Sequence, residues 1–126
     1  MWGGESVKKK DNHISSEFKK TAFLNWLDEA GLSYTVNDDL CIVDGEYGQW
    51  IVNLLLETRG KPTTMQTKLF NMIKTVDRTK ADKFSILIEH SAPDTMTFKS
   101  ISEYVREQLN ISLITVNAKG KIKEYV

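Results

Sequence analysis

The sequence predicts a single α/β domain in which helices cover both faces of a mixed β-sheet of about five strands. Its 126 residues suit one hydrophobic core. A hydrophobic content of 40% and a charged content of 27% are those of an ordinary globular protein. Segments with helical spacing of apolar residues alternate with short β-rich segments, an order that favours parallel strands joined by helices.

We divide the chain into a flexible basic arm, residues 1–16, and one α/β domain, residues 17–126. The arm contains three consecutive lysines and few apolar residues, which is typical of a solvated tail. A first helix is expected directly after it, because apolar residues recur at helical spacing from Phe18 onward. Ser15 or Ser16 can cap its start, and a glycine follows its predicted end.

Three strands are expected next, joined as a meander. Residues 32–36 alternate in polarity, residues 37–39 are turn formers, and residues 40–43 form a short apolar run. Residues 49–58 contain a longer apolar run that would be buried on both faces. Such a run is typical of a central strand.

Helices and strands alternate in the second half of the chain. Thr63 or Thr64 can cap a second helix, and Thr97 can cap a third. Methionines and other apolar residues follow one side of the second helix, and we interpret them as core. The strands expected in this half are residues 84–89, residues 111–116 and a short edge strand that ends at Val126.

The charge and the cysteine content of the chain limit the classes of protein to which it can belong. With 17 basic and 17 acidic residues the formal charge is zero, which argues against a protein that merely coats DNA but does not exclude a nuclease. Cys41 is the single cysteine and stands between apolar residues, so we interpret it as a small core residue. With no disulfide and no apolar run long enough for a membrane span, we expect a soluble cytoplasmic protein.

Two acidic residues and a cation are expected to meet at one end of the sheet. Asp39 opens the second predicted strand, and Glu57 and Arg59 lie at the end of the third and just beyond it. The start of one antiparallel strand lies beside the end of the next, and side chains two residues apart share a face. Two carboxylates beside a cation can hold Mg²⁺ and leave room for water and a phosphate. Simple turn formation by Asp39 and a surface ion pair of Glu57 with Arg59 are the alternatives.

On these residues the sequence resembles the PD-(D/E)xK nuclease superfamily. Its restriction-endonuclease-like core runs helix, three strands, helix, strand, and this chain would add a helix and a strand. Residues 38–43 resemble the segment in which an Asp begins an apolar strand, and residues 55–59 resemble the strand with the acidic residue and the cation. The resemblance implies that Asp39 and Glu57 bind Mg²⁺ or Mn²⁺.

Five further residues receive roles from the same resemblance. Arg59 stands where the superfamily usually has Lys; arginine keeps its proton and binds phosphate as a planar fork, which favours a phosphate-facing role. Lys61 or Lys68 can supply the missing ammonium and contact nucleic acid. Glu17 and Gln66 occupy the places of a metal-binding Glu in the first helix and a supporting polar residue in the second.

The resulting hypothesis is a metal-dependent endodeoxyribonuclease that hydrolyses phosphodiester bonds in DNA, with a homodimer as one way to present two sites. Two alternatives remain open. The first is a non-catalytic nucleic-acid-binding module on a degenerate nuclease-like scaffold. The second is a protein-interaction module, such as an inhibitor or immunity factor that uses its acidic turns against a basic partner.

Overall fold

The computed structural model describes residues 14–45, 48–56, 64–77 and 79–126. Within these residues the chain forms a six-stranded mixed sheet flanked by four helices, so the predicted α/β class is confirmed. The elements in chain order are α2 (Ser16–Glu29), β1 (Ser33–Asn37), β2 (Leu40–Gly45), β3 (Gly48–Asn53), α3 (Met65–Lys74), β4 (Lys83–Glu89), α4 (Ala92–Lys99), α5 (Glu103–Leu109), β5 (Ile111–Val116) and β6 (Ile122–Tyr125).

The strands lie in the sheet in the order in which they occur in the chain, from β1 to β6. The first three form an antiparallel meander, β3, β4 and β5 are parallel, and β6 returns antiparallel to β5. The start of β2 pairs with the end of β3, Leu40 with Asn53. We call the end of the sheet where β3, β4 and β5 terminate and β2 begins the carboxyl end.

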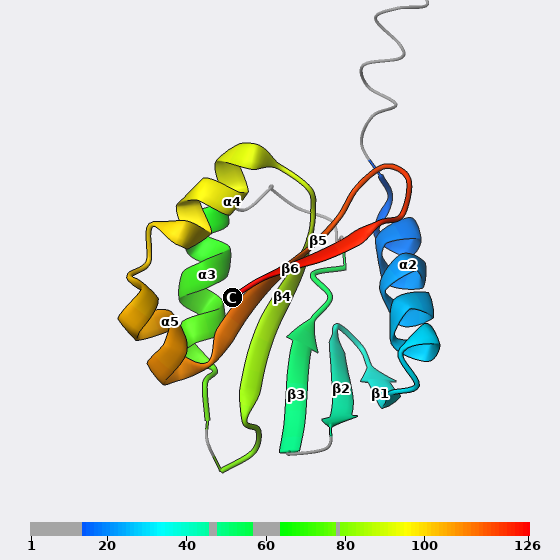
Figure 1. The fold of residues 1–126 in the computed structure, drawn as a ribbon, viewed down its shortest axis with the longest axis horizontal. Helices are drawn as coiled ribbons and strands as arrows, with labels where there is room; N and C mark the ends of the chain where they lie inside the picture. The colour runs from blue at the N-terminus through cyan, green and yellow to red at the C-terminus, as the bar shows by residue number, and fades with distance from the viewer. Residues whose placement is uncertain (1–13, 46–47, 57–63, 78) are drawn as a thin grey trace, which may run out of the picture.

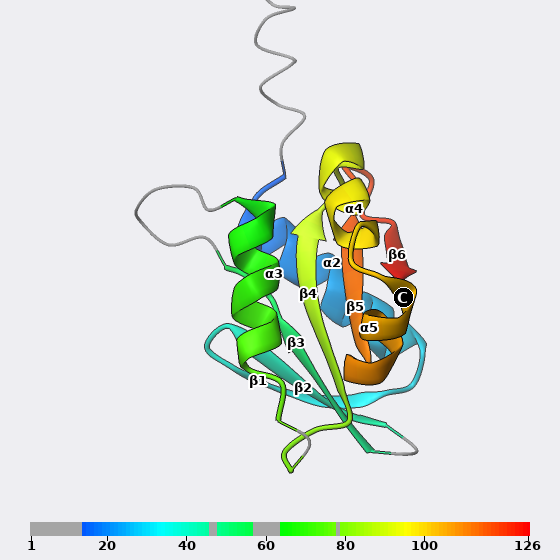
Figure 2. The same ribbon diagram turned by 90° about the vertical axis from the view of Figure 1, so that its left-hand side faces the viewer.

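The helices are divided unequally between the two faces of the sheet. Figure 1 shows α2 on one side and α3, α4 and α5 on the other, and Figure 2 shows these three from their own side. One core packs Phe23 and Leu27 of α2 on residues of β2 to β5. A second core packs α3, through Leu69 and Met72, with Phe98 of α4 on the opposite face. The chain therefore buries apolar side chains on both faces, as the predicted central strands require.

A polar line crosses the otherwise apolar core beneath α2. The Trp50 indole Nε1 donates a hydrogen bond of 2.8 Å to Ser85 Oγ, and Ser85 shares a further hydrogen bond with Ser112 on the next strand. All three side chains are buried. Each of these buried polar atoms has a hydrogen-bond partner, so the line joins β3, β4 and β5 within the core.

Side-chain hydroxyl groups cap the starts of the helices, and the sequence predicts two of these caps. Ser15 Oγ accepts from the Phe18 amide at the start of α2, and Thr64 Oγ1 accepts from the Thr67 amide at the start of α3. The predicted apolar stripe of α2 needs correction, however. Phe18 is 40% exposed, whereas the buried positions are Lys19, Phe23 and Leu27.

The prediction of a third helix capped by Thr97 is wrong, because this region forms two helices. Ser91 caps α4 and Ser102 caps α5, each by accepting from a backbone amide three residues later. Thr97 lies inside α4, where its hydroxyl donates to the Pro93 carbonyl at 3.0 Å. Two serine caps therefore determine the helix starts, and the chain between Lys99 and Glu103 breaks the helix.

The third strand is shorter than expected, ending at Asn53 instead of residue 58. Asn53 Oδ1 accepts a 2.9 Å hydrogen bond from the Leu55 amide, and Leu55 has a left-handed φ of 50°. A side-chain oxygen that bonds the backbone two residues later replaces a ladder bond and turns the chain. Local chemistry at Asn53 thus ends a strand that its apolar composition would have continued.

Phe23 tests the core beneath α2. It is fully buried, and its ring lies 5.9 Å from that of Trp26 and 6.2 Å from that of Trp50, centroid to centroid. Phe23→Ala should lower the free energy of unfolding by about 3–5 kcal/mol, because the cavity cannot be filled from solvent. Phe18→Ala should lower it by about 1 kcal/mol or less. Urea unfolding followed by tryptophan fluorescence measures both, and equal losses would contradict the packing described.

Candidate functional site at the carboxyl end of the sheet

Several element starts and ends gather at the carboxyl end of the sheet. β3 and β4 end there and β2 begins there, and Figures 1 and 2 show the starts of α2, α3 and α4 at this same end. In open α/β sheets, ligands bind outside the carboxyl ends of the parallel strands. Helix starts also carry partial positive charge, which favours anions such as phosphate. Ligand binding is therefore expected at the carboxyl end of the sheet.

Asp39 lies at this end, directly before β2. It is half-buried, and its backbone carbonyl accepts a 2.7 Å hydrogen bond from the amide of Leu54, the first residue after β3. The expectation that the start of the second strand lies beside the end of the third is confirmed. Among the described residues, no hydrogen bond or ion pair engages the Asp39 carboxylate, which leaves its oxygens available to a ligand.

Three of the predicted site residues, Glu57, Arg59 and Lys61, lie outside the described residues. A common face for Glu57 and Arg59 requires a strand that reaches residue 58. Within the described residues, however, β3 ends at Asn53 and the backbone turns at Leu55. Their side-chain directions stay predictions.

The other predicted residues lie in the first turns of two helices. Glu17 is exposed in the first turn of α2, and Gln66 is exposed in the first turn of α3. Lys68 is half-buried on α3. Both helices start at the carboxyl end, so the structure brings these residues and Asp39 to one end of the sheet, from three different elements.

The described residues do not complete a metal site by themselves. Among them, no group of three or more His, Cys, Asp or Glu side chains is placed to hold an ion. Asp39 fits one part of such a site, because a half-buried carboxylate supplies the hard oxygen ligand that Mg²⁺ prefers. The predicted site takes its second carboxylate from Glu57, in the segment after Leu56, and a further one from Glu17 of α2.

Sequence reasoning missed a buried cation at this end, Lys19 of α2. Only 8% of Lys19 is exposed, and its Nζ donates to the carbonyls of Leu55 at 3.0 Å and Leu87 at 3.2 Å. The Lys19 ammonium therefore links two parts of the chain, the segment just after β3 and strand β4. A signal for this position exists in the sequence, since Lys19 precedes Phe23 by four residues and so lies on the same face of the helix.

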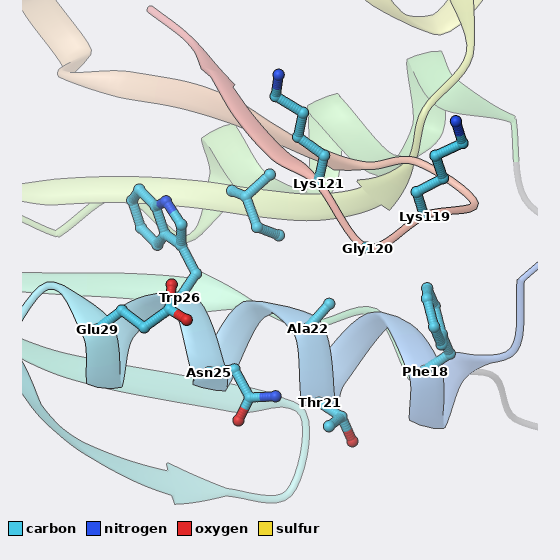
Figure 3. A pocket seen from close by; sticks show the side chains of 10 residues that line it. Phe18, Thr21, Ala22, Asn25, Trp26, Glu29, Lys119, Gly120 and Lys121 are labelled. Atoms are coloured by element: carbon cyan, nitrogen blue, oxygen red, sulfur yellow. The ribbon is translucent and has the colours of Figure 1, made fainter.

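A groove in the surface lies away from the predicted site residues. It is a groove of about 580 Å³ between α2 and the turn that joins β5 to β6, and neither Glu17, Asp39, Gln66 nor Lys68 lines it. In Figure 3 the rings of Phe18 and Trp26 rise from α2 toward the turn, while the Lys119 and Lys121 side chains extend away from the helix. The helix side of the groove therefore mixes apolar and polar residues, and the two lysines of the turn are directed outward.

Comparisons with known proteins identify no relative of this chain. No family model matches the chain, and neither the curated proteins nor the solved structures contain a match. No helix in the part of the chain that the structure describes is long and apolar enough to cross a membrane.

The structure argues against thiol chemistry at Cys41. Cys41 is fully buried, and burial raises the pKa of its thiol to about 11. Because the thiolate is the reactive form, Cys41 should react very slowly with iodoacetamide at pH 8 in the native protein and rapidly in urea. Mass spectrometry of the alkylated protein measures both rates. Fast modification under native conditions would contradict the burial of Cys41.

Proposed function

We propose that the protein is a metal-dependent nuclease that hydrolyses phosphodiester bonds in DNA at the carboxyl end of its sheet. The observation that carries the proposal is the hydrogen bond between the Leu54 amide and the Asp39 carbonyl. It places a half-buried carboxylate beside the chain only three residues before Glu57 and five before Arg59. A carboxylate pair with a neighbouring cation suits metal-assisted phosphodiester hydrolysis.

The order of elements also supports the proposal. The chain runs helix, three-stranded antiparallel meander, helix and parallel strand from α2 to β4. This is the element order that the resemblance to the PD-(D/E)xK superfamily implies. α4, α5, β5 and β6 extend this core at one side of the sheet.

The proposed roles follow from the chemistry of each side chain. Asp39 and Glu57 bind Mg²⁺ or Mn²⁺ through oxygen ligands, and Glu17 provides a further carboxylate from α2. An ion held there would polarise the phosphate and lower the pKa of a coordinated water. Arg59 binds a phosphate oxygen pair through its planar guanidinium and stabilises the negative charge that develops. Gln66, in the first turn of α3, donates to or accepts from the attacking water.

Plasmid cleavage tests the proposal directly. Purified protein should nick or linearise supercoiled DNA with Mg²⁺ or Mn²⁺ and not with EDTA. Asp39→Ala and Glu57→Ala should each slow cleavage by roughly a hundredfold or more, because each removes a carboxylate ligand. Asp44→Ala is the matched control, since Asp44 is exposed at the opposite end of β2 and its loss should leave the rate unchanged.

Two outcomes would contradict different parts of the proposal. Cleavage that neither Asp39→Ala nor Glu57→Ala slows would refute the site assignment while leaving a nuclease activity. DNA binding without cleavage under every metal condition would refute the nuclease and favour the non-catalytic nucleic-acid-binding module.

The lysines near the proposed site should contribute to DNA binding through phosphate contacts. Replacing Lys61 and Lys68 together with Ala should weaken DNA binding in Ca²⁺ and reduce the slope of log K against log salt by roughly two, one for each contact. Lys74→Ala is the control, because Lys74 is in the last turn of α3, at the other end of the helix from Thr64. Fluorescence anisotropy at several salt concentrations measures the slope. An equal effect of Lys74→Ala would show that binding does not favour the carboxyl end.

A further inference from the structure

We propose that the outer edge of β6, with the groove beside it, binds an extended segment of a partner protein in which acidic residues alternate with apolar residues. This surface is separate from the predicted nuclease residues, and the inference does not rest on the proposed function. β6 is the last strand of the sheet, and among the described residues only β5 pairs with it. We call β6 together with the groove between α2 and the turn that joins β5 to β6 the β6 edge.

The backbone of β6 presents donors and acceptors that β5 does not use. The Asn117 amide donates to the Lys121 carbonyl at 3.1 Å. The next pair along the two strands is Val116 with Ile122. In an antiparallel ladder, hydrogen-bonded pairs alternate with pairs that are not hydrogen-bonded to each other. The amides and carbonyls of Ile122 and Glu124 therefore point away from β5, where an added strand can bond them.

One face of β6 carries positive charge. Lys121 and Lys123 are exposed and, being two positions apart, lie on the same face. Figure 3 shows the Lys121 side chain extending away from α2, and Lys123 Nζ lies 5.1 Å from the centroid of the Tyr125 ring. Glu124 belongs to the opposite face, where Lys83 Nζ lies 2.6 Å from its Oε2. The face with the two lysines therefore favours acidic side chains on an added strand.

The other face of β6 borders apolar side chains. Ile122 lines the groove together with Phe18, Ala22 and Trp26 of α2 and with polar residues of the same helix. The three α2 residues are four positions apart, so they form a stripe along one side of the helix. Phe18 is 40% exposed, and a partner side chain in the groove would remove part of this apolar surface from water. Side chains of a strand alternate between its faces, so acidic and apolar residues must alternate in the partner.

The turn that joins β5 to β6 holds the start of this edge in one conformation. Asn117 Oδ1 accepts hydrogen bonds from the amides of Lys119 and Lys121, both at 2.9 Å. Gly120 has a φ of 83°, which a glycine adopts without strain. Because the edge is already ordered, a partner strand loses less free energy to ordering when it binds.

A second copy of this chain is a poorer occupant because of charge. Two antiparallel β6 strands that use the outward backbone groups can place Ile122 opposite Ile122, Ile122 opposite Glu124, or Glu124 opposite Glu124. The first register brings Lys121 opposite Lys123 of the other copy, the second brings the two Lys123 side chains together, and the third pairs the two glutamates. Like charges directly opposite each other destabilise a strand pair. A partner with acidic residues beside the lysines avoids this repulsion.

Peptide selection against the full chain tests the proposal. Two phage-displayed pools of peptides of about ten residues are compared, one alternating Asp or Glu with apolar residues and the other alternating Lys with the same apolar residues. Only the acidic pool should yield binders. Amide hydrogen exchange at Ile122 and Glu124 should be fast in the free protein and slow once a selected acidic peptide is bound.

Ile122→Pro and Ile122→Val form a matched pair of variants. Proline removes the outward N–H but leaves the bonds of β6 to β5, whereas valine keeps the N–H and most of the apolar side chain. By fluorescence anisotropy, Ile122→Pro should weaken binding of the selected peptide by about tenfold and Ile122→Val by about twofold or less. Lys121→Glu combined with Lys123→Glu should also weaken it by about tenfold, and this variant keeps every backbone group if Ile122→Pro does not fold. Lys80→Glu is the charge control, because Lys80 is exposed before β4 and should not affect binding.

Each alternative occupant gives a different result that would overturn the proposal. Slow exchange of both amides in the free protein at every concentration would show that another segment of the same chain covers the edge, and slowing that increases with protein concentration would indicate a second copy. Binders from the lysine pool alone, or protection of the two amides by duplex DNA instead of peptide, would assign the edge to a different partner. Failure of the acidic pool to yield a binder, or equal affinity of the selected peptide for Ile122→Pro and Ile122→Val, would refute strand addition.

Discussion

The structure at the carboxyl end depends on how the carbonyls are satisfied where β3 leaves the sheet. A strand that departs from a parallel neighbour exposes backbone groups that must find other donors. Lys19 donates to the carbonyls of Leu55 and Leu87. The Asp39 carbonyl and Asn53 Oδ1 accept from the amides of Leu54 and Leu55. An α-helix, a turn residue and a neighbouring strand therefore share the task of directing one short segment.

The rest of the fold makes this arrangement rigid. α2 packs Phe23 and Leu27 into the core of its face, so the helix that carries Lys19 cannot shift without disrupting that core. Trp50 contributes to this rigidity in two ways. Its ring contacts Phe23, and its indole Nε1 donates a hydrogen bond to Ser85 on β4. The parallel strands thus meet the carboxyl end in a defined register, on which a site with precise ligand distances would depend.

The place of Asp39 in the fold was predictable from the sequence, and the features that were not predictable have a physical cause. Asp39 was correctly placed beside the end of the third strand, because antiparallel pairing and turn residues are local signals. The end of that strand was misjudged, since an apolar run hides the side-chain bond that Asn53 makes. Lys19 was overlooked because a lysine is normally exposed, and only packing places it among buried residues.

By itself, the sequence determined the α/β class, the positions of the main helices and strands, and the burial of Cys41, because periodicity, caps and turn residues act within a few positions of the chain. The tertiary structure decided which cation enters the sheet and which strand carbonyls it bonds. These features arise from contacts such as that of Lys19 with Leu87, between residues 68 positions apart. Donors and acceptors that far apart become partners only when the chain is folded.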